Sequence, residues 1–222
     1  MYEMDQYTVS LLHFDSGLTD ESDKVWTANG GAVISTTESK FGGNSLYCSA
    51  RGTQWIETPA HSDFNVGSGD FTVECWVKIP STENSQNILG QGMFNSGSDY
   101  HLGIQLSISS TGKLRAQAGA SLKSLLFDIN STTTITDNVW HHIAVIRSGN
   151  IVYLAVDGIL ETPTTVTGSV YLDNSPFRII KGNNGNVGAI GYYDEFRFSK
   201  GIARWTSDFD PNPKVGQALL VV

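Results

Sequence analysis

One run of alternating residues constrains the fold more than any other part of this sequence. Residues 67–80 read GSGDFTVECWVKIP. Successive side chains of a β-strand point to opposite faces, so the run separates into an apolar set and a mixed set. The apolar set is Phe71, Val73, Cys75, Val77 and Ile79, and the mixed set is Thr72, Glu74, Trp76 and Lys78. The pattern predicts a half-buried strand that ends near Pro80, because proline has no N–H for a sheet hydrogen bond.

Most of the chain repeats this pattern of short β-prone runs separated by turn residues. Roughly thirteen runs follow at the spacing of a β-sandwich, without a long amphipathic helix, which predicts an all-β fold of two packed antiparallel sheets. Residues 45–48 and 54–57 are expected to pair as a hairpin, and residues 87–119 to form a meander. Asp157-Gly158 predicts a type I′ turn. A short helical turn is expected at residues 201–205.

Length and charge narrow the classes of protein. The 222 residues suit one domain over residues 1–222, with 1–7 and 213–222 as candidate terminal arms. The net charge of −8 argues against nucleic acid or an anionic membrane as a partner. We find neither a signal peptide nor an apolar run long enough for a membrane helix. We therefore expect a soluble protein.

Cys48 and Cys75 are the only cysteines, and each falls on the apolar side of its strand. We expect two free, buried thiols, because buried cysteine behaves as a small hydrophobic residue. The alternative is a disulfide, if the two strands are neighbours. The sequence contains no CxxC pattern for zinc.

The acidic residues do not predict catalysis. Hydrolysis of a sugar needs two carboxylates on either side of the scissile bond. Glu74 is alone on its strand, and alternation would send Asp194 and Glu195 to opposite faces. His141 and His142 are adjacent too, so we expect one to pack and the other to be exposed. The sequence therefore predicts a protein that is not an enzyme.

Five motifs in a fixed order carry a family resemblance. They are LLHFDSG, ISTTESKFGGNSLYC, DFNVGSGDFTVECWVK, WHHIAVIRSGNIVYLAVDG and YYDEFRFSKGIARW. Together they resemble the laminin-G-like, concanavalin-A-like jelly-roll domains found in virion proteins of tailed bacteriophages. The resemblance spans nearly the whole chain and implies two curved antiparallel sheets. The chain departs from it at Cys48 and Cys75, where similar sequences commonly carry aromatic or aliphatic residues.

The resemblance also implies candidate ligand sites. No cofactor is required, but similar domains often hold Ca²⁺, for which Asp15, Asp20 and Asp194 are the candidate ligands. We favour the alternative that Asp15 and Asp20 cap turns, while Asp194 accepts hydrogen bonds from backbone amides at a bend. Trp55, Tyr100, Tyr192 and Trp205 are candidates for stacking on sugar rings, the alternative being core packing. The apolar tail either adds a strand to its own sheet or binds a neighbouring subunit, which makes its residues candidates for partner binding: Ala218, Leu219, Leu220, Val221 and Val222.

From these observations we expect a non-catalytic virion structural protein, either a capsid decoration protein or part of a tail or fibre. It would be assembled in the host cytoplasm, contact capsid or tail subunits, form a homo-oligomer and bind host glycans in addition. The alternative is a carbohydrate-binding, lectin-like module, and a glycoside hydrolase is retained as an outlier. The fold alone does not separate these functions.

Overall fold

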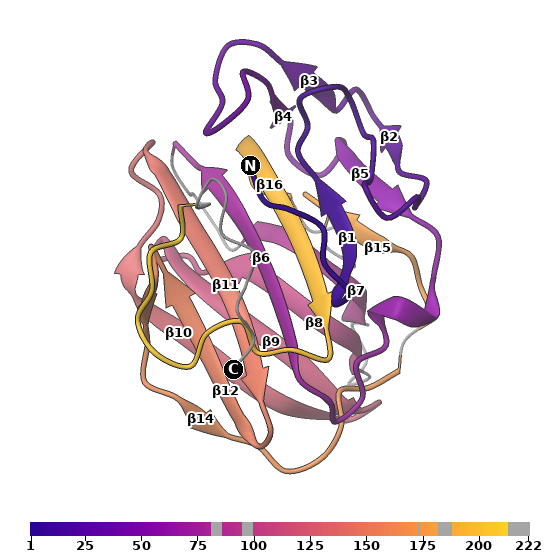
Figure 1. Ribbon diagram of the computed structural model, residues 1–222, viewed down its shortest axis with the longest axis vertical. Helices are drawn as coiled ribbons and strands as arrows, with labels where there is room; N and C mark the ends of the chain where they lie inside the picture. The colour runs from indigo at the N-terminus through magenta and orange to yellow at the C-terminus, as the bar shows by residue number, and fades with distance from the viewer. Residues whose placement is uncertain (81–85, 95–99, 173, 182–187, 213–222) are drawn as a thin grey trace.

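The structure is a computed structural model that describes residues 1–80, 86–94, 100–172, 174–181 and 188–212. Two antiparallel sheets lie face to face, with the nine-stranded sheet in front of the seven-stranded sheet in Figure 1. Within these residues a single 3-10 turn, η1 (Ser62–Phe64), is the helical content. No helix of this described part has the length and apolar character of a membrane span. The predicted all-β, jelly-roll sandwich is confirmed.

The nine-stranded sheet is built around β6 (Phe71–Lys78), which lies between β11 (Trp140–Ser148) and β16 (Gly191–Lys200). Its other strands are β12 (Ile151–Val156), β13 (Ile159–Leu160), β14 (Thr164–Thr165), β4 (Ser45–Cys48), β3 (Val33–Ser35) and β1 (Thr8–Leu12). The seven-stranded sheet has the order β10 (Ser124–Thr134), β9 (Lys113–Ser121), β8 (Tyr100–Ile108), β7 (Gln86–Phe94), β15 (Phe177–Ile179), β5 (Trp55–Thr58) and β2 (Thr27–Asn29).

Inward side chains of the two sheets form one core cluster. The predicted apolar set of β6, together with Ile79, is fully buried in this cluster. The seven-stranded sheet contributes its own inward residues, among them Leu89, Leu106, Ala116 and Phe177. Burying each large apolar side chain stabilises the fold by about 1.5–3 kcal/mol, so this alternation holds the sandwich together.

The opposite face of β6 is also buried, so the prediction of a half-buried strand is wrong. Thr72 and Glu74 are fully buried, and Trp76 is nearly so. The reason is that both ends of the described chain lie over this outer face of the nine-stranded sheet, as Figure 1 shows for the segment that follows β16. Tyr2 packs on Trp76, and the backbone N–H of Arg204 donates to Thr72.

Several local predictions can be compared with the strand pairing. The meander is confirmed, since β7, β8 and β9 are successive neighbours. The turn at Asp157 and Gly158 is confirmed by φ values of 54° and 80°. The hairpin of residues 45–48 and 54–57 is wrong, because β4 pairs with β3 and β16 whereas β5 pairs with β2 and β15 in the other sheet. Residues 201–205 contain no helical turn.

The two cysteines are free and buried, as predicted. Cys48 lies on β4 and Cys75 on β6, and β16 lies between these strands. Two strand spacings amount to about 10 Å, which is beyond the Cα separation that a disulfide bridges.

Candidate functional site

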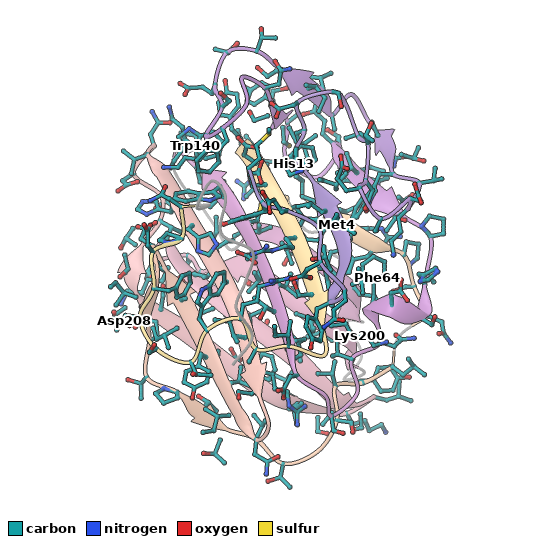
Figure 2. All side chains as sticks on the ribbon, in the orientation of Figure 1. Met4, His13, Phe64, Trp140, Lys200 and Asp208 are labelled. Carbon is teal, nitrogen blue, oxygen red and sulfur yellow. The ribbon has the colours of Figure 1, made fainter. Side chains whose placement is uncertain are left out.

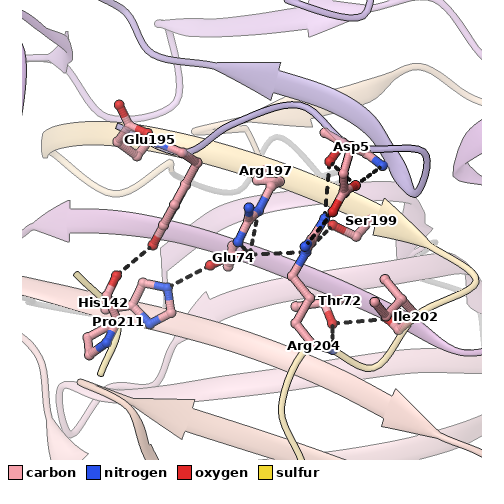
Figure 3. A network of polar contacts seen from close by, with 12 residues as sticks. Asp5, Thr72, Glu74, His142, Glu195, Arg197, Ser199, Ile202, Arg204 and Pro211 are labelled. Carbon is pink, nitrogen blue, oxygen red and sulfur yellow. Dashed lines mark hydrogen bonds and ion pairs between the residues drawn. The ribbon is translucent and has the colours of Figure 1, made fainter. Parts of the chain in front are cut away.

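A buried polar cluster occupies the middle of the outer face of the nine-stranded sheet (Figure 3). At its centre, Oε1 of Glu74 accepts a hydrogen bond from Arg197 Nε at 2.8 Å, and Oε2 lies 3.1 Å from Nε2 of His142. Burial raises the pKa of Glu74, but the charge of Arg197 and the contact with His142 outweigh it and bring the pKa to about 2. The Glu74 carboxylate is therefore ionised and paired within the protein.

Two segments from opposite ends of the described chain close over this cluster. Arg204 donates to both carboxylate oxygens of Asp5, at 2.9 and 3.0 Å. The guanidinium of Arg197 lies 4.2 Å from the ring centroid of Tyr2, whose hydroxyl donates to the carbonyl of Pro211 at 3.2 Å. We call residues 1–7 and 202–211 the terminal clasp. It covers the Glu74 cluster with the chain's own side chains.

A β-bulge at Asp194 and Glu195 overrides the alternation on which one prediction rested. Asp194 accepts the backbone N–H of Phe41 at 3.1 Å, and Glu195 accepts that of Tyr2 at 2.6 Å. Phe41 and Tyr2 both pack with Trp76 on the outer face. The prediction that the two carboxylates lie on opposite faces is therefore wrong. The prediction that Asp194 binds backbone amides is confirmed, and burial raises the pKa of Asp194 to about 7.

The other two aspartates proposed for calcium lie in separate hydrogen-bond arrangements. Asp20 accepts the indole N–H of Trp26 at 2.8 Å and the hydroxyl of Ser22 at 2.6 Å. Asp15 accepts the backbone N–H of Asn44 at 3.4 Å. Across the described residues, no three His, Cys, Asp or Glu side chains form a group that could hold a metal ion. The calcium site of Asp15, Asp20 and Asp194 stays a prediction without a supporting cluster.

The adjacent histidines are both buried, so the prediction that one is exposed is wrong. His142 is part of the Glu74 cluster. His141 lies between two carboxylates, with Nδ1 2.7 Å from Asp157 and Nε2 2.9 Å from Asp137. The hydrogen bond to Asp157 raises the pKa of His141, and the bond to Asp137 adds to it, against the effect of burial.

The aromatic residues predicted to bind glycans are dispersed over the described structure. Trp55 belongs to β5 of the seven-stranded sheet. Tyr192 lies on the nine-stranded sheet and stacks on Tyr47, whereas Trp205 lies in the terminal clasp. Tyr100 begins β8, and its side chain is outside the described part. The predicted partner-binding tail is also outside it: Ala218, Leu219, Leu220, Val221 and Val222.

The outward face of the seven-stranded sheet carries a line of polar positions that crosses every strand. The strand register places one residue from each strand in this line: Asp128 (β10), Gln117 (β9), Gln105 (β8), Gly90 (β7), Arg178 (β15), Glu57 (β5) and Thr27 (β2). Their sequence neighbours point into the core, among them Leu106, Ala116, Phe177 and Ile56. We call this line the polar row.

The polar row is exposed at its ends and shielded in its middle. Gln117 and Gln105 are only 3% and 5% exposed, whereas the side chains of Asp128 and Glu57 are 32% and 29% exposed. Gly90 adds no side chain at the centre. The two glutamines are therefore almost fully buried, between more exposed, charged residues of the row.

Each carboxylate of the polar row is paired with an arginine. Nε of Arg115 donates to Asp128 at 2.7 Å, and Nε of Arg178 donates to Glu57 at 2.8 Å. Burial raises the pKa of Glu57, but the hydrogen bond and charge of Arg178 outweigh it, so the pKa of Glu57 is lowered. The charges of the row are thus balanced in pairs.

Gln105, near the middle of the polar row, leaves one hydrogen-bonding group unused. Its Nε2 donates to Oδ1 of Asn87, but its buried Oε1 has no hydrogen-bond partner among the described residues. Gln117 instead uses its Nε2 on Asp128, at 3.1 Å. Buried polar atoms are nearly always paired, so Oε1 of Gln105 stands out as an acceptor without a partner among the described residues.

The polar row was not predicted from the sequence, although the sequence does show alternation in two of its strands. The segments HLGIQLSI and KLRAQAGA alternate apolar and polar residues, which predicts an outward polar face. Alternation does not give the register between strands, however. Bulges in β7, between Asn87 and Leu89 and between Gly90 and Gly92, decide which residues lie opposite one another.

The comparisons with known proteins agree with this architecture. Residues 50–204 match the family model described as the concanavalin A-like lectin/glucanases superfamily. No curated protein matches the sequence closely enough to serve as a relative.

Solved structures similar to the chain include a toxin domain and a domain of an enzyme. The binding domain of Paraclostridial Mosquitocidal Protein 1 is 16% identical, with a TM-score of 0.69, over 88% of this chain and 49% of that one. Domain 4 of AbnA, a GH43 extracellular arabinanase from Geobacillus stearothermophilus, was solved in complex with arabinotriose. It is 19% identical to this chain, with a TM-score of 0.65, and the match covers 89% of this chain and 94% of that one.

A third similar structure is the binding domain of botulinum neurotoxin DC in complex with SialylT, which is 16% identical with a TM-score of 0.66. The match covers 49% of the botulinum neurotoxin domain and 49% of the mosquitocidal protein domain, so this chain spans about half the length of each. The structural likeness shows the fold, and the family model covers most of the chain. The protein belongs to the concanavalin A-like lectin/glucanase superfamily.

Proposed function

We propose that the protein is a non-catalytic, lectin-like module that binds a neutral oligosaccharide along the polar row. The observation that carries the proposal is the buried pair Gln105 and Gln117, in which Oε1 of Gln105 has no hydrogen-bond partner among the described residues. Planar amide side chains offer donors and acceptors together, which suits the neighbouring hydroxyl groups of a sugar. The row extends across seven strands, so a chain of several sugar residues would have room to lie along it.

The carboxylates of the row support binding rather than hydrolysis. Asp128 and Glu57 lie on β10 and β5, five strand spacings apart in the sheet order. Five spacings amount to about 24 Å, whereas glycosidases place their two carboxyl groups about 5–9.5 Å apart. Arg178 also lowers the pKa of Glu57, so Glu57 is poorly suited to act as a general acid.

Two similar structures support the class of ligand, but not its position on this chain. Domain 4 of AbnA was solved with arabinotriose, and the botulinum neurotoxin DC domain with SialylT. Sugar binding by these proteins motivates the same class of ligand for this chain, while the choice of the polar row rests on its own residues.

The proposal is tested on an array of immobilised neutral and sialylated oligosaccharides. We expect the protein to bind neutral oligosaccharides, and Gln105→Leu to reduce that binding at least tenfold while leaving the melting temperature nearly unchanged. Tenfold corresponds to about 1.4 kcal/mol, the size of one or two hydrogen bonds. Gln6→Leu is the matched control, because Gln6 is exposed and outside the polar row. Absence of binding to every sugar, or full binding by Gln105→Leu, would overturn the proposal.

We also propose that this module is carried by a bacteriophage particle, as a decoration, tail or fibre component. The support is the ordered set of five motifs, which resembles virion proteins. Gold-labelled antibodies against the protein should decorate one part of the particle in electron micrographs. Phage particles that contain the protein nowhere on their surface would refute this setting without affecting the sugar-binding proposal.

A further inference from the structure

A second row of side chains crosses the outer face of the nine-stranded sheet, at the Lys78 end of β6. The register places Val33 (β3), Tyr47 (β4), Tyr192 (β16), Lys78 (β6) and Trp140 (β11) in line. Glu74 precedes Lys78 on β6, so the buried cluster around Glu74 lies to one side of this line. Trp140, labelled in Figure 2, is the first residue of β11. We call this line the aromatic row.

The two tyrosines of the aromatic row form one flat, preformed surface. Their ring centroids are 4.4 Å apart and their planes differ by 20°. Both rings are half-buried, so part of each remains open to solvent. Trp140 lies two strands beyond Tyr192, at a distance of about 10 Å from strand spacing alone. Its indole is anchored, because it packs against the cluster of Tyr2, Leu11 and Trp76.

Polar groups lie between these aromatic rings. Nζ of Lys78 is 2.7 Å from a carboxylate oxygen of Glu38. The indole N–H of Trp140 is buried and has no hydrogen-bond partner among the described residues. An unpaired buried donor is costly, so a ligand that accepts a hydrogen bond from it gains that energy.

We propose that the aromatic row is a second saccharide-binding site, which takes a neutral pyranose oligosaccharide on the sheet opposite the polar row. A pyranose ring has C–H groups that stack on Tyr and Trp and hydroxyl groups that pair with the Trp140 N–H, Lys78 and Glu38. The centre of a protein–protein interface is depleted of charged residues, whereas an ion pair lies at the centre of this row. The inference extends the proposed function, but it rests on a separate set of residues.

The test uses the tryptophan indole N–H signals of the full chain in two-dimensional NMR, with cellotriose as the probe. Trp140 reports on the aromatic row, and Trp55, two residues from Glu57 on β5, reports on the polar row. Trp26 is an internal control, because its N–H is buried and bonded to Asp20. We expect millimolar cellotriose to shift the Trp140 signal and to leave Trp26 unchanged.

Two variants identify the residues responsible. Tyr192→Leu keeps an apolar side chain but removes the flat ring, and we expect it to weaken the cellotriose-dependent shift of Trp140 at least fivefold. Tyr192→Phe keeps the ring and should retain the shift. A shift that survives in Tyr192→Leu would contradict the proposal.

The indole signals also separate this site from the polar row. A shift of Trp55 without any shift of Trp140 would refute the second site and leave the proposed function intact. A shift of Trp140 alone would support the second site and count against the polar row. If the Trp140 signal moves with protein concentration in the absence of sugar, the face is an interface between copies of the chain, which would overturn the proposal.

Discussion

Among single residues, Glu74 shows that alternation predicts the direction of a side chain but not its burial. Its outward direction followed from the sequence of β6. Its burial did not, because it depends on Arg197 and on a clasp formed by residues distant in sequence. The bulge at Glu195 could not be predicted from the sequence either. Glu195 has a φ of 49° and its partners are distant in sequence, so the segment YYDEFRF contains no local pattern that indicates a bulge.

The first prediction concerns the charge of Glu74. Glu74→Gln keeps the shape of the side chain but leaves Arg197 and His142 without a buried negative partner, so we expect a loss of about 3 kcal/mol in the free energy of unfolding. Urea titration followed by tryptophan fluorescence measures this loss. Glu3→Gln removes an exposed carboxylate and should change little. Equal stability of the two variants would mean that the Glu74 cluster does not hold the clasp.

At the scale of elements, sequence patterns predicted strands better than their partners. Alternation identified β6, β11 and β12, and turn residues identified the hairpin at Asp157 and Gly158. The error at β4 and β5 has a physical reason: a short turn allows a hairpin, but the chain crosses between sheets there instead. Pairing and register depend on residues far apart in sequence, which is why the polar row was not predicted.

The second prediction concerns the contact between a hairpin and the terminal clasp. Gly158 has a φ of 80°, and an added Cβ would lie 1.9 Å from the carbonyl oxygen of Phe209. Gly149 also has a positive φ, but nothing lies within 4 Å of its Cβ position. Gly149→Ala should cost about 1 kcal/mol through backbone strain. Gly158→Ala should cost about 2 kcal/mol more, because the clasp must move.

Hydrogen exchange distinguishes the cause of this difference. The backbone N–H of Phe209 donates to the carbonyl of Gly158 at 2.9 Å. In Gly158→Ala this N–H should lose protection selectively, and in Gly149→Ala it should keep it. If both variants are equally stable and equally protected, residues 202–211 are not fastened to the sheet through this turn.

At the scale of the whole molecule, the two sheets have different outward faces. The nine-stranded sheet is covered in its middle by the terminal clasp, whereas the seven-stranded sheet carries the polar row. Net charge argued against nucleic acid or an anionic membrane as a partner. It did not indicate which face binds, because that depends on how the ends of the chain pack.

The third prediction concerns the pH dependence of stability. The lowered pKa values of Asp5 and Glu74, each to about 2, give stability that is present above their ordinary pKa and lost as the pH falls towards 2. The raised pKa values of His13, His141 and Asp194 have the opposite sign. They give stability that is present below each ordinary pKa and lost as the pH rises through the raised value, which is about 7 for Asp194.

These two groups of residues together place the maximum of stability at about pH 4–5. Urea midpoints measured at a series of pH values should rise from pH 2 to this maximum and decline beyond it. A midpoint that keeps rising up to pH 8 would contradict the raised pKa values of His13, His141 and Asp194.

A neutral oligosaccharide that lies on the polar row would contact the side-chain amides of Gln105 and Gln117. The most direct measurement is the NMR shift of the side-chain amide signals of Gln105 and Gln117 when the tightest-binding oligosaccharide of the array is added. We expect both amides to shift in a saturable way. The amide of Asn44, which donates to the carbonyl of Asp15 in a loop, should not shift. Saturable binding of the sugar that leaves the amides of Gln105 and Gln117 unchanged would contradict binding on the polar row.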